Sequence, residues 1–343
     1  MRFKGFMNSF CLALASMSLF LFSQAVSAQE LKTVRFAYSA ISTAYLPLWI
    51  GTEAKISQAY GIRPEMIYIS GGSTIMQALV SGEIEVAYSG GLAATSVAAS
   101  GAKVKGVFGM HNVLPYRFFI RKELTGKVKG PEGLKGLKGA VSRRGSESEV
   151  AFLQILKKAG LSDRDMTILQ VGGSGERLAA LQSGAVDVIG LVPPVDLTTE
   201  KLGFPILLDL ARENIPWAHT VVAMNQDWMR QQPALAEAVV KSAIEATYFG
   251  VKNKDFTKKV LAKYARIKDD DVQQYGYEVF ARLYARDFLP SEKGFEATVE
   301  MLAPRQPAAA KLTSSDLVDS SIVKKLAESG FVAEMKKKYG IRD

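Results

Sequence analysis

The residues best suited to bind a small solute are the small hydroxyl and glycine residues that follow predicted strands. Such residues let a ligand approach the backbone closely, and a helix that starts there presents free N–H groups. Because ligands bind beyond the carboxyl ends of strands in open α/β sheets, we expect the site at these turns. The candidates in the first half are Ser39, Ala40, Tyr45, Ser73, Thr74, Ser89, Gly90 and Asn112. Those in the second half are Arg143, Arg144, Gly145, Ser146, Ser174, Pro193 and Trp217.

Arg143 and Arg144 carry the strongest chemical signal of this set, because they precede a predicted helix that begins at Glu147. A guanidinium group at such a point can bind a carboxylate, a sulfonate or a phosphate through two hydrogen bonds. The same arginines could instead be solvated, or could pair with Glu147 and Glu149. A small organic anion is therefore the favoured ligand.

The alternative ligand is a neutral or cationic heteroaromatic molecule that stacks on Tyr45 or Trp217. The sequence gives no support for an enzyme. Gly172-Gly173-Ser174 is followed by Gly175-Glu176, so it does not form a G-x-S-x-G elbow, and no phosphate-binding loop or H-E-x-x-H motif occurs. His111 and His219 are the only histidines and lack partners at ligand spacing, so neither a metal nor a cofactor is expected.

Strands that alternate with helices must position these residues. The pattern predicts strands at 34–39, 65–70, 85–90 and 104–110, and again at 139–142, 166–171, 186–191 and 204–210. It predicts helices at 43–60, 74–82 and 92–101, and again at 147–161 and 177–184. This alternation indicates parallel pairing in an α/β fold.

The two halves of this pattern resemble each other. GGSTIMQALVSGEIEVAYSG at 71–90 matches GGSGERLAALQSGAVDVIGL at 172–191 in its turn, its helix, its Ser-Gly stop and its next strand. The two Ser-Gly pairs lie 102 residues apart. We therefore expect two similar α/β lobes within one chain.

From about Pro233 onward, apolar residues recur at helical spacing and predict helices only. The segments 115–122 and 220–228 are expected to be extended crossings between the lobes. The predicted division is 31–114 with 225–343 as lobe 1, and 115–224 as lobe 2. Two crossings predict a hinge beside a ligand-binding cleft.

The N-terminal residues have the three parts of a secretory signal. Arg2 and Lys4 give a positive start, 10–22 form an apolar run, and small residues precede a cut after Ala28. The run is shorter than the roughly 20 residues that span a bilayer. We expect cleavage there and export to the periplasm. The only cysteine, Cys11, lies within the removed segment.

The 343 residues carry a net charge of +9, which raises the question of a nucleic-acid partner. The basic residues are spread along the chain, without an aromatic-interleaved basic stripe or zinc-finger spacing. No nucleic-acid partner is expected, and a basic balance also suits the attraction of anions.

Several segments together resemble a known family. They are VRFAYS with YLPLWIG and YGI, the 71–90 segment, PEGLKGLKGAV, GAVDVIGLVPP and DLVDSSIVKKLAESGF, all downstream of the signal. Their order from about residue 31 to 335 resembles that of nitrate/sulfonate/taurine-type periplasmic substrate-binding proteins of ABC importers. Binding proteins for thiamine pyrimidine precursors share this pattern.

The resemblance implies a type II periplasmic binding protein fold. It has two lobes, each a mainly parallel sheet flanked by helices, and the lobes close over a small solute. It also implies a monomer that delivers its solute to membrane permease subunits of an ABC transporter. A periplasmic sensory protein that reports to a receptor is the remaining alternative. The pocket residues match no single subfamily.

Overall fold

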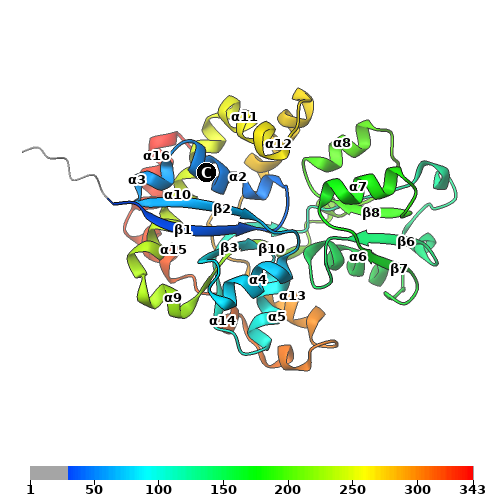
Figure 1. Cartoon of the computed structure of the whole chain (residues 1–343), viewed down its shortest axis with the longest axis horizontal. Coiled ribbons are helices and arrows are strands. Elements are labelled where there is room, and N and C mark those ends of the chain that lie inside the picture. The colour runs from blue at the N-terminus through cyan, green and yellow to red at the C-terminus, as the bar shows by residue number, and fades with distance from the viewer. Residues whose placement is uncertain (1–29, 343) are drawn as a thin grey trace, which may run out of the picture. The chain divides into compact units, whose positions relative to one another are not determined.

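The computed structural model describes residues 30–342, and the elements below belong to the compact unit that begins at Lys32. The first five-stranded sheet has the order β2-β1-β3-β10-β4 (Figure 1). Its strands are β1 (Lys32–Tyr38), β2 (Ile62–Tyr68), β3 (Val86–Ser89), β4 (Val104–Val113) and β10 (Pro216–Asn225). β1 pairs in parallel with β2 and β3, whereas β10 pairs antiparallel with β3 and β4.

The second sheet also has five strands, in the order β7-β6-β8-β5-β9. They are β5 (Arg117–Ile120), β6 (Lys138–Val141), β7 (Thr167–Gln170), β8 (Val188–Leu191) and β9 (Ile206–Asp209). β6 pairs in parallel with β7 and β8, and β5 pairs antiparallel with β8 and β9. Each sheet thus has one antiparallel strand in the same place, which confirms the predicted mainly parallel sheets.

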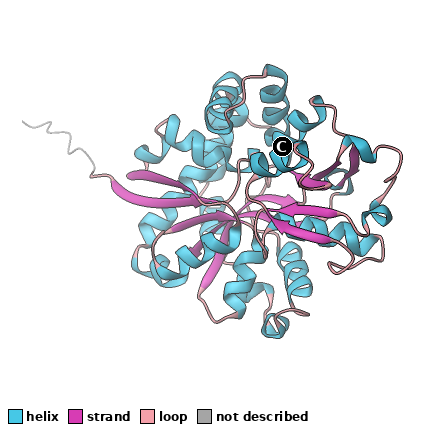
Figure 2. Ribbon diagram, turned by 45° about the vertical axis from the view of Figure 1, so that its right-hand side comes forward, coloured by secondary structure: helices cyan, strands magenta, loops and turns pink. Residues whose placement is uncertain are grey.

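The helices that follow these strands cover the sheets on both faces (Figure 2). α4 precedes β3 and α7 precedes β8, as the internal similarity predicts. The glycines at the matching ends, Gly82 and Gly184, both have a positive φ that only glycine adopts easily. The helices of these two halves are α2 (Leu46–Glu53), α3 (Ile56–Ala59), α4 (Gly72–Ser81), α5 (Gly91–Ala99), α6 (Glu147–Lys158), α7 (Ser174–Gln182) and α8 (Val195–Lys201).

The predicted helix at 43–60 is not continuous. A 3-10 turn, Thr43–Tyr45, comes before α2, and α3 starts only after Lys55. Lys55 adopts a left-handed conformation with φ of 57°, which breaks the helical hydrogen-bond ladder between α2 and α3.

The segment after β10 is helical, apart from the turns between helices and a single bridge from Val318 to Gly106 of β4. The predicted change to helices is therefore confirmed. The Thr313 and Asp316 side chains form a capping box at the start of α14. The helices are α9 (Gln226–Gln231), α10 (Pro233–Lys252), α11 (Lys254–Ala265), α12 (Asp270–Leu283), α13 (Glu292–Leu302), α14 (Ser314–Leu317), α15 (Ser321–Glu328) and α16 (Phe331–Tyr339).

The segment at 220–228 is only partly extended. β10 ends at Asn225, whose side chain accepts a hydrogen bond from the Asp227 backbone N–H and so starts α9. β10 pairs within the first sheet over its whole length. The chain returns from the second sheet to the first between β9 and Pro216. The other segment, 115–122, contains β5, which pairs within the second sheet.

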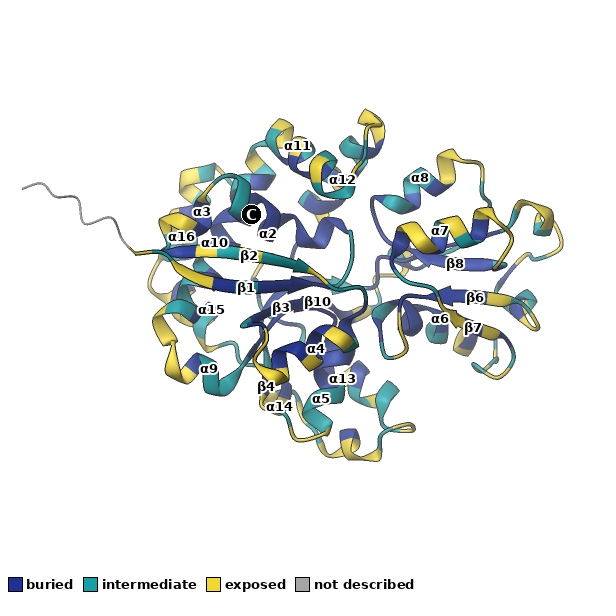
Figure 3. Ribbon diagram, in the orientation of Figure 1, coloured by how far each residue is buried: buried dark blue, intermediate teal, exposed yellow. Residues whose placement is uncertain are grey.

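Apolar side chains from both faces of each sheet form the core. Figure 3 shows the buried parts of the strands and helices in dark blue. Trp49 stacks on Tyr264 in the cluster that packs α2 and α10 against the first sheet. Phe118 and Phe152 meet edge to face in the cluster that packs α6 against the second. Among residues 30–342, no helix combines the length and apolar character needed to cross a membrane. The predicted cut after Ala28 lies outside the described residues.

Two isoleucines of the second sheet test how much burial in its core contributes to the free energy of unfolding. Ile189 on β8 is fully buried, whereas Ile206 on β9 is 40% exposed. Ile189→Ala should lower the free energy of unfolding by about 2–5 kcal/mol, because it leaves a cavity. Ile206→Ala makes the same chemical change on a strand of the same sheet and should cost less than about 1 kcal/mol. Urea unfolding measures both, and equal losses would contradict this account of the core.

Candidate functional site

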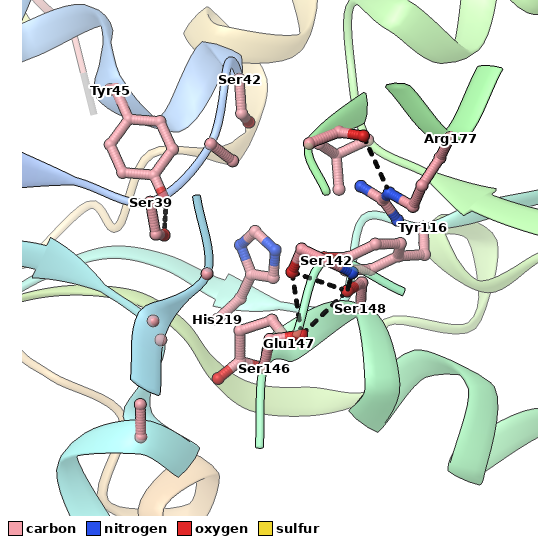
Figure 4. Close-up of a pocket in the computed structure, with 17 residues that line it drawn as sticks. Ser39, Ser42, Tyr45, Tyr116, Ser142, Ser146, Glu147, Ser148, Arg177 and His219 are labelled. Atoms are coloured by element: carbon pink, nitrogen blue, oxygen red, sulfur yellow. Dashed lines mark hydrogen bonds between the residues drawn. The ribbon is translucent and has the colours of Figure 1, made fainter. Parts of the chain in front are cut away.

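A small pocket lies where loops of the two sheets meet (Figure 4). Figure 4 shows Ser39 and Tyr45 on one side of His219, and Arg177 and the serines of 142–148 on the other. Residues from the first sheet and its loops are Ser39, Ala40, Ser42, Tyr45, Gly71, Gly72, Gly90, Ala93 and His219. Residues from the second are Tyr116, Ser142, Ser146, Glu147, Ser148, Gly173, Arg177 and Val192.

Four helix N-termini converge on this pocket, two from each sheet. The N-cap residues of α4, α5, α6 and α7 are Gly71, Gly90, Ser146 and Gly173, and all four line the pocket. In none of the four helices does the N-cap side chain accept a hydrogen bond from a backbone N–H group of its own helix. The positive ends of four helices therefore face one small space, which is the arrangement that binds anions.

Arg177 adds a positive charge to the same space. Its residue is only 2% exposed, and burial lowers the pKa of its guanidinium, which nevertheless stays protonated. It donates hydrogen bonds to the Gly173 carbonyl at 3.3 Å, to the Ser174 hydroxyl at 3.2 Å and to the Gly190 carbonyl. No carboxylate among residues 30–342 lies at ion-pair distance from the Arg177 guanidinium. A guanidinium group has five N–H donors, so two remain for a ligand.

The Glu147 side chain lies at the first position of α6 and reaches toward the first sheet. Its carboxyl accepts hydrogen bonds from the backbone N–H of Leu92, at 3.2 Å, and from the indole N–H of Trp217. Loss of hydration raises the pKa of Glu147 to about 8, although these two hydrogen bonds act in the opposite direction. A Cβ atom on Gly90 would overlap with Oε1 of Glu147. Glycine at position 90 is what permits this close approach.

Hydroxyl groups and a neutral histidine complete the lining. The hydroxyls of Ser142, Ser146 and Ser148 lie within 3.0 Å of one another, and the Tyr45 hydroxyl lies 2.7 Å from that of Ser39. Burial lowers the pKa of His219 to about 3, so its ring is uncharged at neutral pH. These groups offer hydrogen bonds to a polar ligand without adding charge.

His111 stacks on His219, with ring centroids 6.2 Å apart, and burial lowers its pKa to about 4. Within residues 30–342, no group of three or more His, Cys, Asp or Glu side chains could hold a metal ion.

The structure brings part of the predicted site together. Ser39, Ala40, Tyr45, Gly90 and Ser146 line the pocket. The other predicted residues do not line it: they are Ser73, Thr74, Ser89, Asn112, Arg143, Arg144, Gly145, Ser174, Pro193 and Trp217. Several of these lie directly behind the lining, as Ser174 does beside Arg177 and Trp217 beside Glu147.

The arginine pair has other surroundings. Arg144 donates to Glu149 at 2.7 Å and to the Ile168 carbonyl at 3.2 Å, so it forms the ion pair that was the alternative interpretation. Arg143 is exposed and its side chain packs against Gly71. The arginine that lines the pocket is Arg177 instead.

Sequence reasoning missed Arg177, Glu147, Tyr116 and His219 as lining residues. The repeat contains a signal for Arg177. At the spacing of 102 residues that relates the two halves, Arg177 corresponds to Ile75, which is fully buried in the core. A charged residue at a position where the other half has a core residue indicates a special role. Glu147 gives a weaker signal, because a carboxylate in the first turn of a helix is common.

The contact between Gly90 and Glu147 can be tested with two glycines at helix starts. Gly90→Ala should lower the free energy of unfolding by about 1–3 kcal/mol, because the new methyl group overlaps with the carboxyl. Gly175→Ala in α7 is the control. A Cβ there meets nothing within 4 Å, and alanine should be neutral or stabilise the helix by up to about 1 kcal/mol. A loss at Gly175 equal to that at Gly90 would argue against the overlap.

Solved structures share this fold. A protein from Bordetella bronchiseptica RB50 has a TM-score of 0.78 at 22% identity, with 91% of this chain and 99% of that chain covered. The periplasmic aliphatic sulphonate binding protein SsuA from Escherichia coli has a TM-score of 0.67 at 16% identity, covering 84% and 92%. The periplasmic nitrate-binding protein NrtA from Synechocystis PCC 6803 has a TM-score of 0.74 at 15% identity, covering 90% and 91%.

These similarities confirm the predicted periplasmic binding protein fold. A comparison with curated proteins finds no match to the sequence. The family comparison matches residues 27–265, which include both sheets and the whole lining of the pocket. The chain belongs to the NMT1-like family.

Proposed function

We propose that this protein is the solute-binding component of an ABC uptake system and that it captures a small organic anion, such as a sulfonate or a carboxylate. The observation that carries the proposal is the convergence of four helix N-termini and the Arg177 guanidinium on one pocket. The protein would deliver the anion to permease subunits in the membrane. The printed functions of two structural neighbours, sulphonate binding and nitrate binding, support this class of ligand.

The residues proposed to hold the anion come from both sheets. Arg177 would bind it through its two remaining N–H groups, and backbone N–H groups that remain free at the helix starts would bind its other oxygens. Hydroxyls of Ser39, Tyr45 and Ser146 lie in the same lining and would add hydrogen bonds. This assignment moves the arginine role from the 143–144 loop to α7.

The two sheets are proposed to form two lobes that close over the solute. We propose the first crossing near 114–116. We propose the second at about 210–216 rather than at 224, and the pairing of β10 within the first sheet supports this choice. Contacts that would break on opening include Lys201 with Asp269, at 2.6 Å, and the Tyr275 hydroxyl with Asp196, at 2.7 Å.

We also propose that residues 1–28 direct export and are removed, so that the protein works in the periplasm as a monomer. The tripartite N-terminal pattern and the fold shared with periplasmic binding proteins support this location.

A thermal-shift screen tests the ligand class. The panel comprises alkanesulfonates, carboxylates, nitrate, phosphonates and pyrimidines, in amine buffers that add no oxyanion. A ligand at 100 times its Kd should stabilise the protein by about 2.7 kcal/mol, which raises Tm measurably. Stabilisation by uncharged aromatics alone would exclude the anion proposal and favour the heteroaromatic alternative.

Arg177→Gln tests the anion contact. This change should weaken binding of the best anion by at least about thirtyfold, because loss of a buried charge partner costs about 2–5 kcal/mol. Arg212→Gln removes an arginine whose side chain is 87% exposed and should leave Kd unchanged. Titration calorimetry measures Kd, and Tm without ligand checks that each variant is folded. Wild-type affinity in a folded Arg177→Gln protein would remove Arg177 from the site.

Closure predicts a smaller radius of gyration when the ligand is bound, because the solute favours the state in which both lobes contact it. Small-angle scattering with and without the best anion measures this change. The sample without ligand must first be dialysed after partial unfolding, so that no copurified solute holds it closed. Two identical scattering curves would contradict lobe closure.

A further inference from the structure

The Glu147 carboxyl belongs both to the pocket wall and to the contact between the two sheets. It comes from α6 of the second sheet, and its two hydrogen-bond donors, Leu92 in α5 and Trp217 in β10, belong to the first. It lines the same pocket as Arg177. Opening the pocket would separate Glu147 from both donors and return it to water.

The surroundings of Glu147 leave its charge without a direct partner. No Lys, Arg or His side chain of residues 30–342 lies at ion-pair distance from it. The titratable groups that line the pocket around it come from four places: Arg177 in α7, His219 in β10, Tyr45 after β1 and Tyr116 before β5. The start of α5 contributes only backbone N–H groups.

The charges of these four neighbouring groups do not change near neutral pH. His219, with its pKa lowered to about 3, is neutral, and Tyr45, with its pKa raised to about 12, is also neutral. Burial raises the pKa of Tyr116 still further, and Arg177 stays positive. Glu147, whose pKa is raised to about 8, is the one group in this lining that can gain or lose a proton there.

An anion in this pocket would bring a second negative charge next to the Glu147 carboxylate in a space shielded from water. Two such charges each oppose the ionisation of the other. A protonated carboxyl group removes this repulsion and supplies an O–H donor to an oxygen of the anion.

We propose that Glu147 takes up one proton from the solvent as the pocket closes over the anion, and that its O–H then binds the anion. This inference rests on the proposed function. One proton from water or buffer adds to one carboxylate oxygen, and no other bond changes. Glu147 therefore selects anions that present an acceptor oxygen to it, and it disfavours ligands that place an ammonium group there.

Calorimetry can count this proton. Ethanesulfonate, nitrate and acetate are the probes, because none of them titrates between pH 6 and 8. Imidazole, bis-Tris and Tris serve as buffers at pH 7, since they differ in ionisation enthalpy and their basic forms are neutral amines. The slope of binding enthalpy against buffer ionisation enthalpy gives the protons taken up per anion. We expect a value near one for the wild-type protein.

The pH dependence of Kd gives a second readout. The pKa of Glu147 in an open, hydrated pocket should be near the ordinary glutamate value of about 4.3. Burial as in this structure raises that pKa to about 8, and a bound anion would raise it further. Between these values the complex holds more protons than the free protein. Affinity is therefore highest at low pH, and Kd should rise by up to about tenfold per pH unit between pH 6 and 8.

Glu147→Gln keeps the shape of the side chain and removes its titration. It should bind the same probe without proton uptake and with a Kd that no longer changes with pH. Glu176→Gln is the matched control, because Glu176 is an exposed glutamate in the first turn of α7 that does not line the pocket. It should keep the wild-type proton count. The wild-type count alone decides the inference even if Glu147→Gln folds poorly.

The outcomes separate the two proposals. If no anion of the panel binds, both the anion proposal and this inference fail. If an anion binds with no proton uptake, or with proton release, only the inference fails. Proton uptake that persists in Glu147→Gln and disappears in His219→Gln would assign the proton to the histidine and would also overturn it.

Discussion

The guanidinium of Arg177 is a charge held almost entirely out of water, and the pocket around it is organised by that fact. It donates hydrogen bonds to two carbonyls and a hydroxyl. These bonds offset only part of the hydration free energy that the guanidinium loses on burial. The starts of α4, α5, α6 and α7 add positive potential at the same point. Glu147 is the one carboxyl in the lining, and burial as in this structure raises its pKa. With its carboxyl buried in this way, the pocket is short of negative charge.

This charge arrangement depends on an asymmetry between two similar halves. The parallel strands have the same order in both sheets, with one antiparallel strand inserted at the same place. Both sheets also supply two helices whose N-termini face the pocket. At equivalent positions of α4 and α7, however, one half has the apolar Ile75 in its core and the other has Arg177 at the pocket. The repeat thus places backbone N–H groups of both halves symmetrically around the pocket. A few side chains, which differ between the halves, determine the charge of the ligand that the pocket can bind.

Much of the fold follows from local patterns in the sequence. The alternation of strands and helices, the repeat and the helical C-terminal part could all be predicted, because apolar periodicity and Gly stops depend on neighbouring residues. The break at Lys55 and the start of α9 could not, since they depend on a left-handed residue and on an Asn225 cap. The pairing of β10 with the first sheet is a long-range contact that no local pattern contains.

The site was harder to predict than the fold for the same reason. Turn residues such as Ser39, Gly90 and Ser146 follow strands directly, so their place in the lining could be read from the chain. Whether an arginine in a first turn or a loop faces the pocket depends on packing between segments far apart in sequence. Arg144 pairs with Glu149, five residues away, whereas Arg177 forms no ion pair with its sequence neighbour Glu176 and lines the pocket.

The lack of capping by the four N-cap side chains has a consequence for the stability of the protein in the cell. A bound anion would accept hydrogen bonds from the backbone N–H groups that remain free at these helix starts, and so would complete secondary structure in both halves at once. The protein without ligand would then be less stable. It would open more often at the pocket between the two sheets and expose its loops to proteases. Molecules with a bound anion would in this way persist longest.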